Sequence, residues 1–141
     1  MEKSPKGKKM SIQIIVPCAI ITSKSAAWGS KERELFKASQ EAIRYAVQNS
    51  PHRTQLAQWL ESRTKLAMTI EFHLSNQRVH NSDLDSLLAD LLNPLVEGAC
   101  GPRPEGKPTP QTKDALFWQI NVAKVVDSEE KVIINIEPLQ G

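Results

Sequence analysis

The sequence has few cysteines, few aromatic residues and no long apolar run, and these shortages exclude several classes of protein. Only Cys18 and Cys100 occur among 141 residues, so no disulfide framework is required, and no Cys/His spacing is typical of a zinc site. No apolar run reaches the ~20 residues that cross a membrane, and no apolar stretch of signal-peptide length follows the N-terminal lysines. We therefore expect a soluble, cytoplasmic protein without a membrane partner.

Motifs of several enzyme classes are also missing. The chain has no Ser/His/Asp spacing, no Gly-rich phosphate loop and no nucleotide-binding fingerprint, so we expect no nucleotide cofactor. Aromatic residues make up 5% of the chain, and its three tryptophans are too scattered to form a platform for stacked bases. We interpret Trp118, which falls in an apolar stretch, as a residue of the core or of a dimer interface.

The net charge of +2 conceals a difference between the two halves of the chain. Residues 1–65 carry twelve Lys and Arg against five Asp and Glu, a balance of +7, and residues 66–141 carry six against eleven, a balance of −5. A basic half and an acidic half suit a polyanionic partner combined with a cation-binding site, and ordinary charge scatter is the alternative interpretation.

The hydrophobic pattern predicts a single mixed α/β (α+β) domain over residues 11–141, with a mixed sheet covered by helices on at least one face. A hydrophobic content of 40% is enough for a core. Residues 1–10 are expected to form a flexible basic tail, and residues 98–113 a loop rich in proline and glycine. The strands are expected at residues 11–22, 66–74, 114–126 and 131–137, and the helices at residues 31–49, 52–64 and 83–97.

Local signals predict how these elements end. Pro17 cannot donate a backbone hydrogen bond and should weaken strand pairing. Pro94 is expected to kink or end the third helix, with Gly98 as its natural stop. Residues 75–82 are polar and are expected to form a loop, and residues 127–130 are expected to form a hairpin connection between the last two strands.

Two aspartates at the start of the third predicted helix form the most informative local pattern. Successive helical residues are ~100° apart, so Asp83 and Asp85 converge only if Asp83 has a non-helical backbone at the helix entry. Clustered carboxylates repel one another unless a cation is bound, and Mg²⁺ prefers such oxygen ligands. The alternative is that both carboxylates simply complement the helix dipole, because aspartate is a favoured N-cap and first-turn residue.

The stretch TIEFHLSNQRVHNSDLDSLLADLLNPL, followed later by KDALFWQINVAK, resembles the RusA-type family of Holliday junction resolvases. The resemblance extends over residues 12–137, and its specific part is the three aspartates Asp83, Asp85 and Asp114. It implies that these aspartates bind Mg²⁺ or Mn²⁺ and that a homodimer cuts branched DNA, such as a Holliday junction in recombination and repair, at two symmetrically placed phosphates.

Two positions depart from the pattern of that family. The family has an asparagine after the second aspartate and a lysine three positions later, where this chain has Ser86 and Ala89. The lysine would stabilise charge that develops in the transition state. Lys113 and Lys124 are the candidates to replace it, and we assign Lys124 a catalytic role. The alternative is a catalytically weak or inactive relative that binds branched DNA without cutting it.

Basic side chains outside the aspartate cluster are candidates for DNA binding. Four of them are predicted to contact phosphates: Arg33, Lys37, Arg44 and Arg78. For the first three, which share one face of a predicted helix, an ordinary solvated face is the alternative interpretation.

Three further hypotheses remain open. Asp114 with Glu129, Glu130 and Lys131 resembles the D…ExK pattern of restriction-type nucleases. His73 falls on the polar face of its strand and is a second candidate catalytic residue. The chain is also compatible with a protein-interaction module that has no DNA role, which would bind a four-way junction no more tightly than a random duplex.

Overall fold

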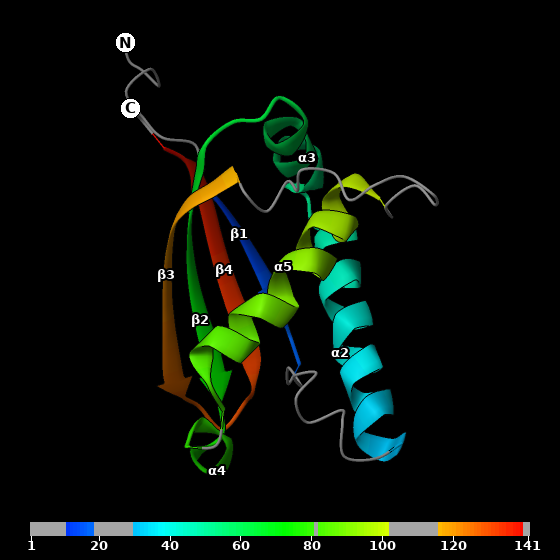
Figure 1. Ribbon diagram of the computed structural model, residues 1–141, viewed down its shortest axis with the longest axis vertical. Helices are drawn as coiled ribbons and strands as arrows, with labels where there is room; N and C mark the ends of the chain where they lie inside the picture. Colours follow the sequence, from blue (N-terminus) through cyan, green and yellow to red (C-terminus); the bar gives the residue numbers. More distant parts are fainter. Residues whose placement is uncertain (1–10, 19–29, 81, 102–115, 140–141) are drawn as a thin grey trace.

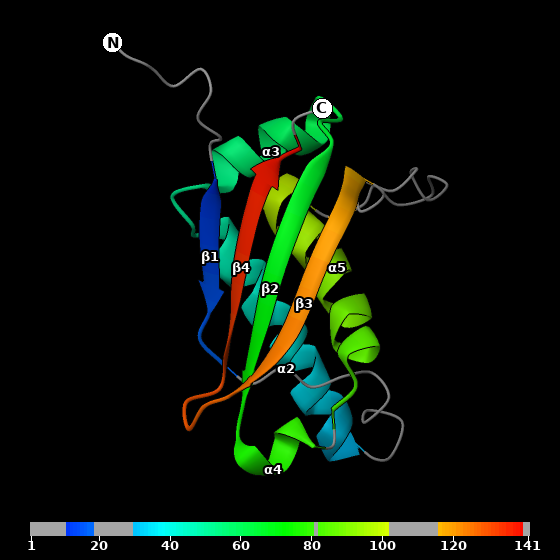
Figure 2. The ribbon, with the colours of Figure 1, turned by 90° about the vertical axis from the view of Figure 1, so that its left-hand side faces the viewer.

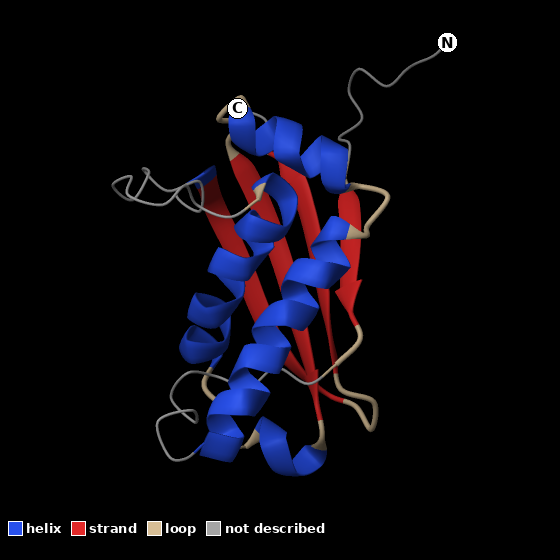
Figure 3. Cartoon of the chain, turned by 90° about the vertical axis from the view of Figure 1, so that its right-hand side faces the viewer, coloured by secondary structure: helices blue, strands red, loops and turns tan. Residues whose placement is uncertain are grey.

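The computed structural model describes residues 11–18, 30–80, 82–101 and 116–139, and these residues form one sheet with helices on one of its faces (Figures 1 and 3). This architecture confirms the predicted mixed α/β domain. The strands are β1 (Ile12–Val16), β2 (Leu66–Leu74), β3 (Phe117–Val126) and β4 (Lys131–Pro138). The helices are α2 (Ser30–Gln48), α3 (Arg53–Glu61), α4 (Asn76–Val79) and α5 (Leu84–Cys100).

The core lies between the sheet and the helices because apolar residues alternate along the strands. Every second residue of β2 is buried: Leu66, Met68, Ile70, Phe72 and Leu74. Helix α5 contributes three fully buried leucines to the core, Leu87, Leu91 and Leu95. They recur every four residues and therefore form one stripe along the helix. The opposite face of the sheet carries no helix among the described residues (Figure 2).

The strand order is β1-β4-β2-β3, in which β4 is antiparallel to both β1 and β2 and β3 runs parallel to β2. The predicted hairpin between the last two strands is therefore wrong, because β2 lies between β3 and β4. The connection passes around the end of β2, where the Asp127 N–H donates to the Leu74 carbonyl at 2.9 Å. A four-residue polar turn is compatible with either path, and only the long-range pairing of β2 decides between them.

Helix α5 continues past both residues that were expected to end it. Pro94 and Gly98 are buried inside the helix, which ends at Cys100, and Gly101 follows with a φ of 91° that favours glycine. Gly98 has a packing role, because a Cβ at this position would lie 2.7 Å from Val47 Cβ on α2. The missing side chain allows α2 and α5 to pack closely.

Other boundaries agree with the sequence or differ by short segments. Strand β1 ends at Val16, directly before Pro17, where strand pairing was predicted to weaken. The expected loop at residues 75–82 contains the short helix α4, whose N-cap Ser75 accepts a hydrogen bond from the Arg78 N–H. The predicted tail and most of the predicted Pro/Gly-rich loop lie outside the described residues. None of the helices described is long and apolar enough to cross a membrane.

Candidate functional site

Asp83 and Asp85 stand at the start of α5, where the chain arrives from β2 through α4. Asp83 is the N-cap and has an extended backbone (φ −89°, ψ 134°), and Asp85 lies in the first helical turn. Both residues are exposed. The Asp83 side chain makes no capping hydrogen bond to α5, whereas Asp85 Oδ1 accepts the Ser86 N–H at 3.0 Å. The predicted non-helical entry at Asp83 is thus confirmed, and it removes the constraint that would place the two carboxylates on opposite sides of a helix.

This pair of carboxylates has the chemistry that a magnesium ion requires. Mg²⁺ takes hard oxygen ligands and is commonly held by one or two carboxylates, with waters and substrate phosphates completing its shell. The exposure of both aspartates leaves room for such additional ligands. Within the described ranges, no group of three or more His, Cys, Asp or Glu side chains is placed to hold a metal ion, so any third acidic ligand would come from elsewhere.

Lys124 lies beside the segment that leads into Asp83. Its position in β3 is opposite Phe72, and its Nζ donates to the Val79 carbonyl at 2.6 Å and to the Ser82 carbonyl at 3.0 Å. In the sequence, only the resemblance to the RusA-type family assigned Lys124 to this site. In the structure, its ammonium group is bonded to backbone carbonyls at the end of α4 and directly before α5.

Asp114, the third predicted ligand, lies outside the described residues, and its role stays a prediction. The first described residues after it are Leu116 and Phe117, at the beginning of β3. Phe117 pairs with Leu66, and Lys124 pairs with Phe72. Phe117 and Lys124 therefore lie towards opposite ends of β3. At ~3.3 Å per residue, their separation along the strand is about 23 Å.

The four predicted DNA contacts fall into two groups. Arg33 and Lys37 are exposed on α2, one helical turn apart. Arg44 instead forms an ion pair with Glu97 on α5 at 2.8 Å, and a second one with Glu41 on its own helix at 3.1 Å. The Nε of Arg78 lies 3.4 Å from Glu130. The last two arginines therefore already have carboxylate neighbours within the chain, which a phosphate would have to displace.

A second cluster of ionisable side chains lies on the helix-free face of the sheet, and we refer to Glu71, His73, Asp127 and Lys131 as the His73 cluster. His73 Nε2 is 3.0 Å from Glu71 and its Nδ1 is 2.9 Å from Asp127, while Lys131 is 3.3 Å from Asp127. Alternation along β2 was sufficient to place Glu71 and His73 on one face. Nothing local indicated Asp127, which is 54 residues from His73.

Electrostatics within the His73 cluster shift two pKa values in opposite directions. The hydrogen bonds to Glu71 and then Asp127 raise the pKa of His73, because both stabilise the imidazolium. The backbone N–H of Glu129, together with His73, lowers the pKa of Asp127 to about 2. A neutral imidazole can donate only one of its two bonds, so this arrangement favours a protonated ring. Both ring nitrogens of His73 are therefore engaged with carboxylates of the same chain.

The acidic turn that resembles a D…ExK pattern is engaged in structural contacts. Glu130 accepts the Ser75 N–H at 2.8 Å and lies beside Arg78, so it links the β3–β4 turn to the beginning of α4. Lys131 pairs with Asp127 rather than pointing to the start of α5. The nuclease role of this pattern depends on Asp114 and stays a hypothesis.

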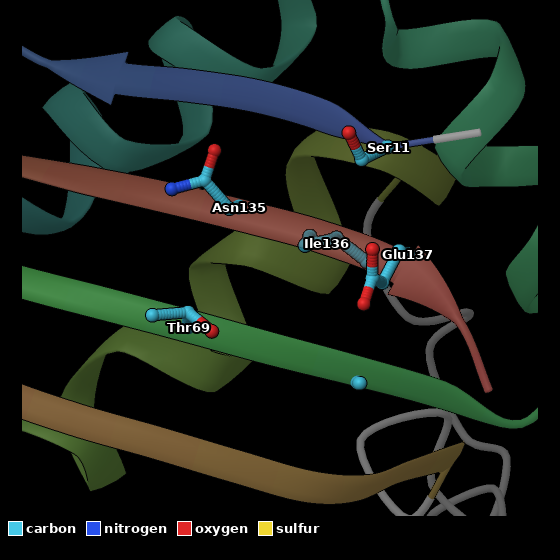
Figure 4. A pocket seen from close by; sticks show the side chains of 6 residues that line it. Ser11, Thr69, Asn135, Ile136 and Glu137 are labelled. Carbon is cyan, nitrogen blue, oxygen red and sulfur yellow. The ribbon is translucent and has the colours of Figure 1, made fainter. Parts of the chain in front are cut away.

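The helix-free face of the sheet has a shallow hollow of about 220 Å³ (Figure 4). Its lining is polar and small, formed by Ser11, Ala67, Thr69, Asn135, Ile136 and Glu137. Gln13 beside it donates to Asn135 Oδ1 at 3.1 Å. Asp83 and Asp85 do not line this hollow, so the candidate metal ligands and the hollow are separate features.

Comparisons with known proteins supply no family for this chain. None of the models of known protein families matches it, and no curated protein matches it either. The arrangement of the residues themselves is therefore what a functional proposal must rest on.

Proposed function

We propose that this protein is a Mg²⁺- or Mn²⁺-dependent endonuclease for branched DNA, similar in its site to the RusA-type Holliday junction resolvases. The observation that carries the proposal is the pair of exposed carboxylates at the mouth of α5, one on an extended N-cap and one in the first turn. A lysine lies close by, since Lys124 is bonded to the Ser82 carbonyl directly before Asp83.

In this proposal, the residues at the start of α5 act as oxygen ligands. Asp83 and Asp85 would hold the cation, and the exposed α2 residues Arg33 and Lys37 would contact phosphates and orient the duplex. A bound Mg²⁺ supplies charge neutralisation and a water of lowered pKa for attack on phosphorus. In the hydrolysis, a P–O bond to the attacking water forms as this water loses a proton, the P–O bond to the leaving deoxyribose oxygen breaks, and that oxygen takes a proton.

We further propose that a homodimer supplies the complete set of carboxylates. Within one subunit, the chain that follows Asp114 enters β3 at the end opposite Lys124, about 23 Å away along the strand. This distance within one subunit does not limit Asp114 of a second subunit. A mixture of Asp85→Asn and Asp114→Asn chains tests it, since mixed dimers of two inactive variants would regain one intact shared site only if the ligands come from different subunits.

A second candidate function is binding of branched DNA without cleavage. Ala89 favours it, because this exposed residue is one turn beyond Asp85, on the same side of α5, where the family has a lysine. A site that lacks this positive charge would still bind a cation and DNA, but it would stabilise the transition state less.

The test is incubation of the purified protein with a synthetic four-way junction, with Mg²⁺, with Mn²⁺ and with a chelator. Metal-dependent products that disappear in Asp85→Asn support the nuclease. The matched control is Asp90→Asn, which removes the same charge from α5 beyond its first turn. A shifted band without products would favour the binding protein, and junction affinity equal to that for random duplex would contradict both.

A further inference from the structure

Lys124 connects the edge strand of the sheet to the segment that carries the candidate metal ligands. It lies on β3, while its acceptors are Val79, the last residue of α4, and Ser82, in the connection from α4 to α5, 45 and 42 residues earlier in the chain. Helix α4 and the start of α5 both lie near the same end of the sheet as the end of β3 (Figure 2). One ammonium group thus bonds a carbonyl at the end of α4 and a carbonyl directly before Asp83.

The bond to Ser82 acts on Asp83 through a shared peptide plane. The Ser82 carbonyl and the Asp83 N–H belong to one planar peptide unit, so fixing the carbonyl fixes the orientation in which the chain enters Asp83. That entry is the extended backbone that an N-cap requires. Helix α5 orients Asp85 and holds the Asp83 carbonyl, which accepts the Leu87 N–H at 3.1 Å, whereas Lys124 holds the peptide on the N-terminal side of Asp83.

We propose that Lys124 is a positioning residue for the metal ligands, holding Asp83 in its extended conformation through the Ser82 and Val79 carbonyls. This inference rests on the proposed metal site and changes the role of one residue within it. Lys124 was expected to replace the absent lysine of the family at the phosphate. Two of the three N–H groups of its ammonium are instead used on backbone carbonyls.

The two roles predict opposite effects of removing the ammonium. A positive charge near a cation site repels the cation, so its loss alone would leave the affinity for a divalent metal unchanged or increase it. If Lys124 positions Asp83, its loss disorders a ligand and weakens metal binding. Outer-shell residues of metal sites typically change metal affinity about 10- to 100-fold when they are replaced.

The experiment measures Mn²⁺ binding to the full chain by calorimetry, without DNA, for the wild type, Lys124→Met and Lys65→Met. Lys65 is the matched control, because it is an exposed lysine at the start of β2, whose ammonium lies over the Trp118 ring. We expect about 10-fold weaker binding in Lys124→Met and no more than a twofold change in Lys65→Met. If Lys124→Met does not fold, Lys124→Gln replaces it under the same criterion.

Each outcome separates this inference from the function on which it rests. Mn²⁺ that binds to the wild type and equally or more tightly to Lys124→Met would overturn the positioning role and leave the metal site standing. If the wild type takes up no Mn²⁺, or Asp85→Asn binds it as the wild type does, the proposed metal site fails and the positioning role fails with it. Weaker binding in both lysine variants would mean that the loss is not specific to residue 124, which also overturns the positioning role.

Discussion

The side-chain amide of Gln40 on α2 donates a 2.8 Å hydrogen bond to the backbone carbonyl of Asp90 on α5. In a regular α-helix this carbonyl would accept the N–H of residue 94, four positions later. Residue 94 is Pro94, which has no N–H. The side chain of one helix therefore provides the donor that the proline of the other cannot, and α5 continues through Pro94 to Cys100.

Replacing Gln40 with alanine should lower the free energy of unfolding by about 1 kcal/mol, because the Asp90 carbonyl loses a half-buried donor. Urea unfolding measures the change. In a Pro94→Ala background the N–H of residue 94 becomes available, so the cost of Gln40→Ala should fall by at least half. Equal costs in both backgrounds would show that the two residues are not coupled.

Most of the fold follows from periodicity, and the exceptions involve partners distant in the sequence. Strict alternation predicted β2 with its observed bounds, and the apolar stripe of α5 was recognisable despite Pro94. Its end was mispredicted because the compensating Gln40 is 50 residues away, and because Gly98 serves the contact with Val47 instead of a turn. The hairpin between the last two strands was mispredicted for the same reason, since the pairing of β2 with both β3 and β4 leaves no local signature in the four residues that connect β3 to β4.

The candidate site was predicted in its local part only. The spacing of Asp83 and Asp85 and the need for a non-helical entry could be derived from helix geometry. The bonds of Lys124 to carbonyls more than 40 residues away could not, and the positioning role proposed for this lysine rests on them. Arg44 was assigned to an exposed basic face, but its partner Glu97 lies 53 residues further along the chain. Charge pattern alone does not distinguish an arginine that meets solvent from one that bridges two helices.

The His73 cluster should make stability depend on pH above neutrality. His73 has a raised pKa in the folded protein, so its contribution is fully present below the pKa of an unfolded histidine, ~6.5, and is lost as the pH rises through the higher folded value. The unfolding free energy should therefore decrease from pH 6.5 upwards. Urea midpoints measured at intervals between pH 2 and pH 9 test this expectation.

Two variants identify the residue responsible. His73→Gln should flatten the decrease, whereas His80→Gln, at an exposed position, should leave it unchanged. Asp127, with a pKa lowered to about 2, contributes stability above its ordinary value of 3.8 that is lost as the pH falls through about 2. The acid limb should thus survive in His80→Gln and weaken in Asp127→Asn. A His73→Gln profile as steep as that of the wild type would contradict the assignment.

Releasing Arg44 should strengthen DNA binding if this arginine contacts phosphates. Glu97 holds it at 2.8 Å, with both side chains about one-third exposed or less. Glu97→Gln should therefore increase the affinity for a four-way junction about two- to fivefold, the equivalent of one partly exposed ion pair. Fluorescence anisotropy at fixed salt concentration measures it. The same substitution in an Arg44→Ala background is the control: a gain that persists there reflects general charge and excludes Arg44 as the contact.

Introducing a lysine at residue 89 should increase cleavage of a four-way junction if the protein is the proposed nuclease. Ala89 is exposed and lies four residues after Asp85, so the two side chains share one side of α5, and a lysine there would place a positive charge beside the carboxylates without disturbing the core. Removing a single donor to developing transition-state charge from an evolved site lowers the rate about 10²- to 10³-fold. We therefore expect Ala89→Lys to increase the single-turnover rate at least tenfold.

Ala89→Gln controls for side-chain length, and Ala89→Lys combined with Asp85→Asn should be inactive. Cleavage that appears only in Ala89→Lys would identify the natural protein as the binding relative, whereas a Lys variant no faster than the Gln variant would mean that the charge at this position is not what limits the reaction.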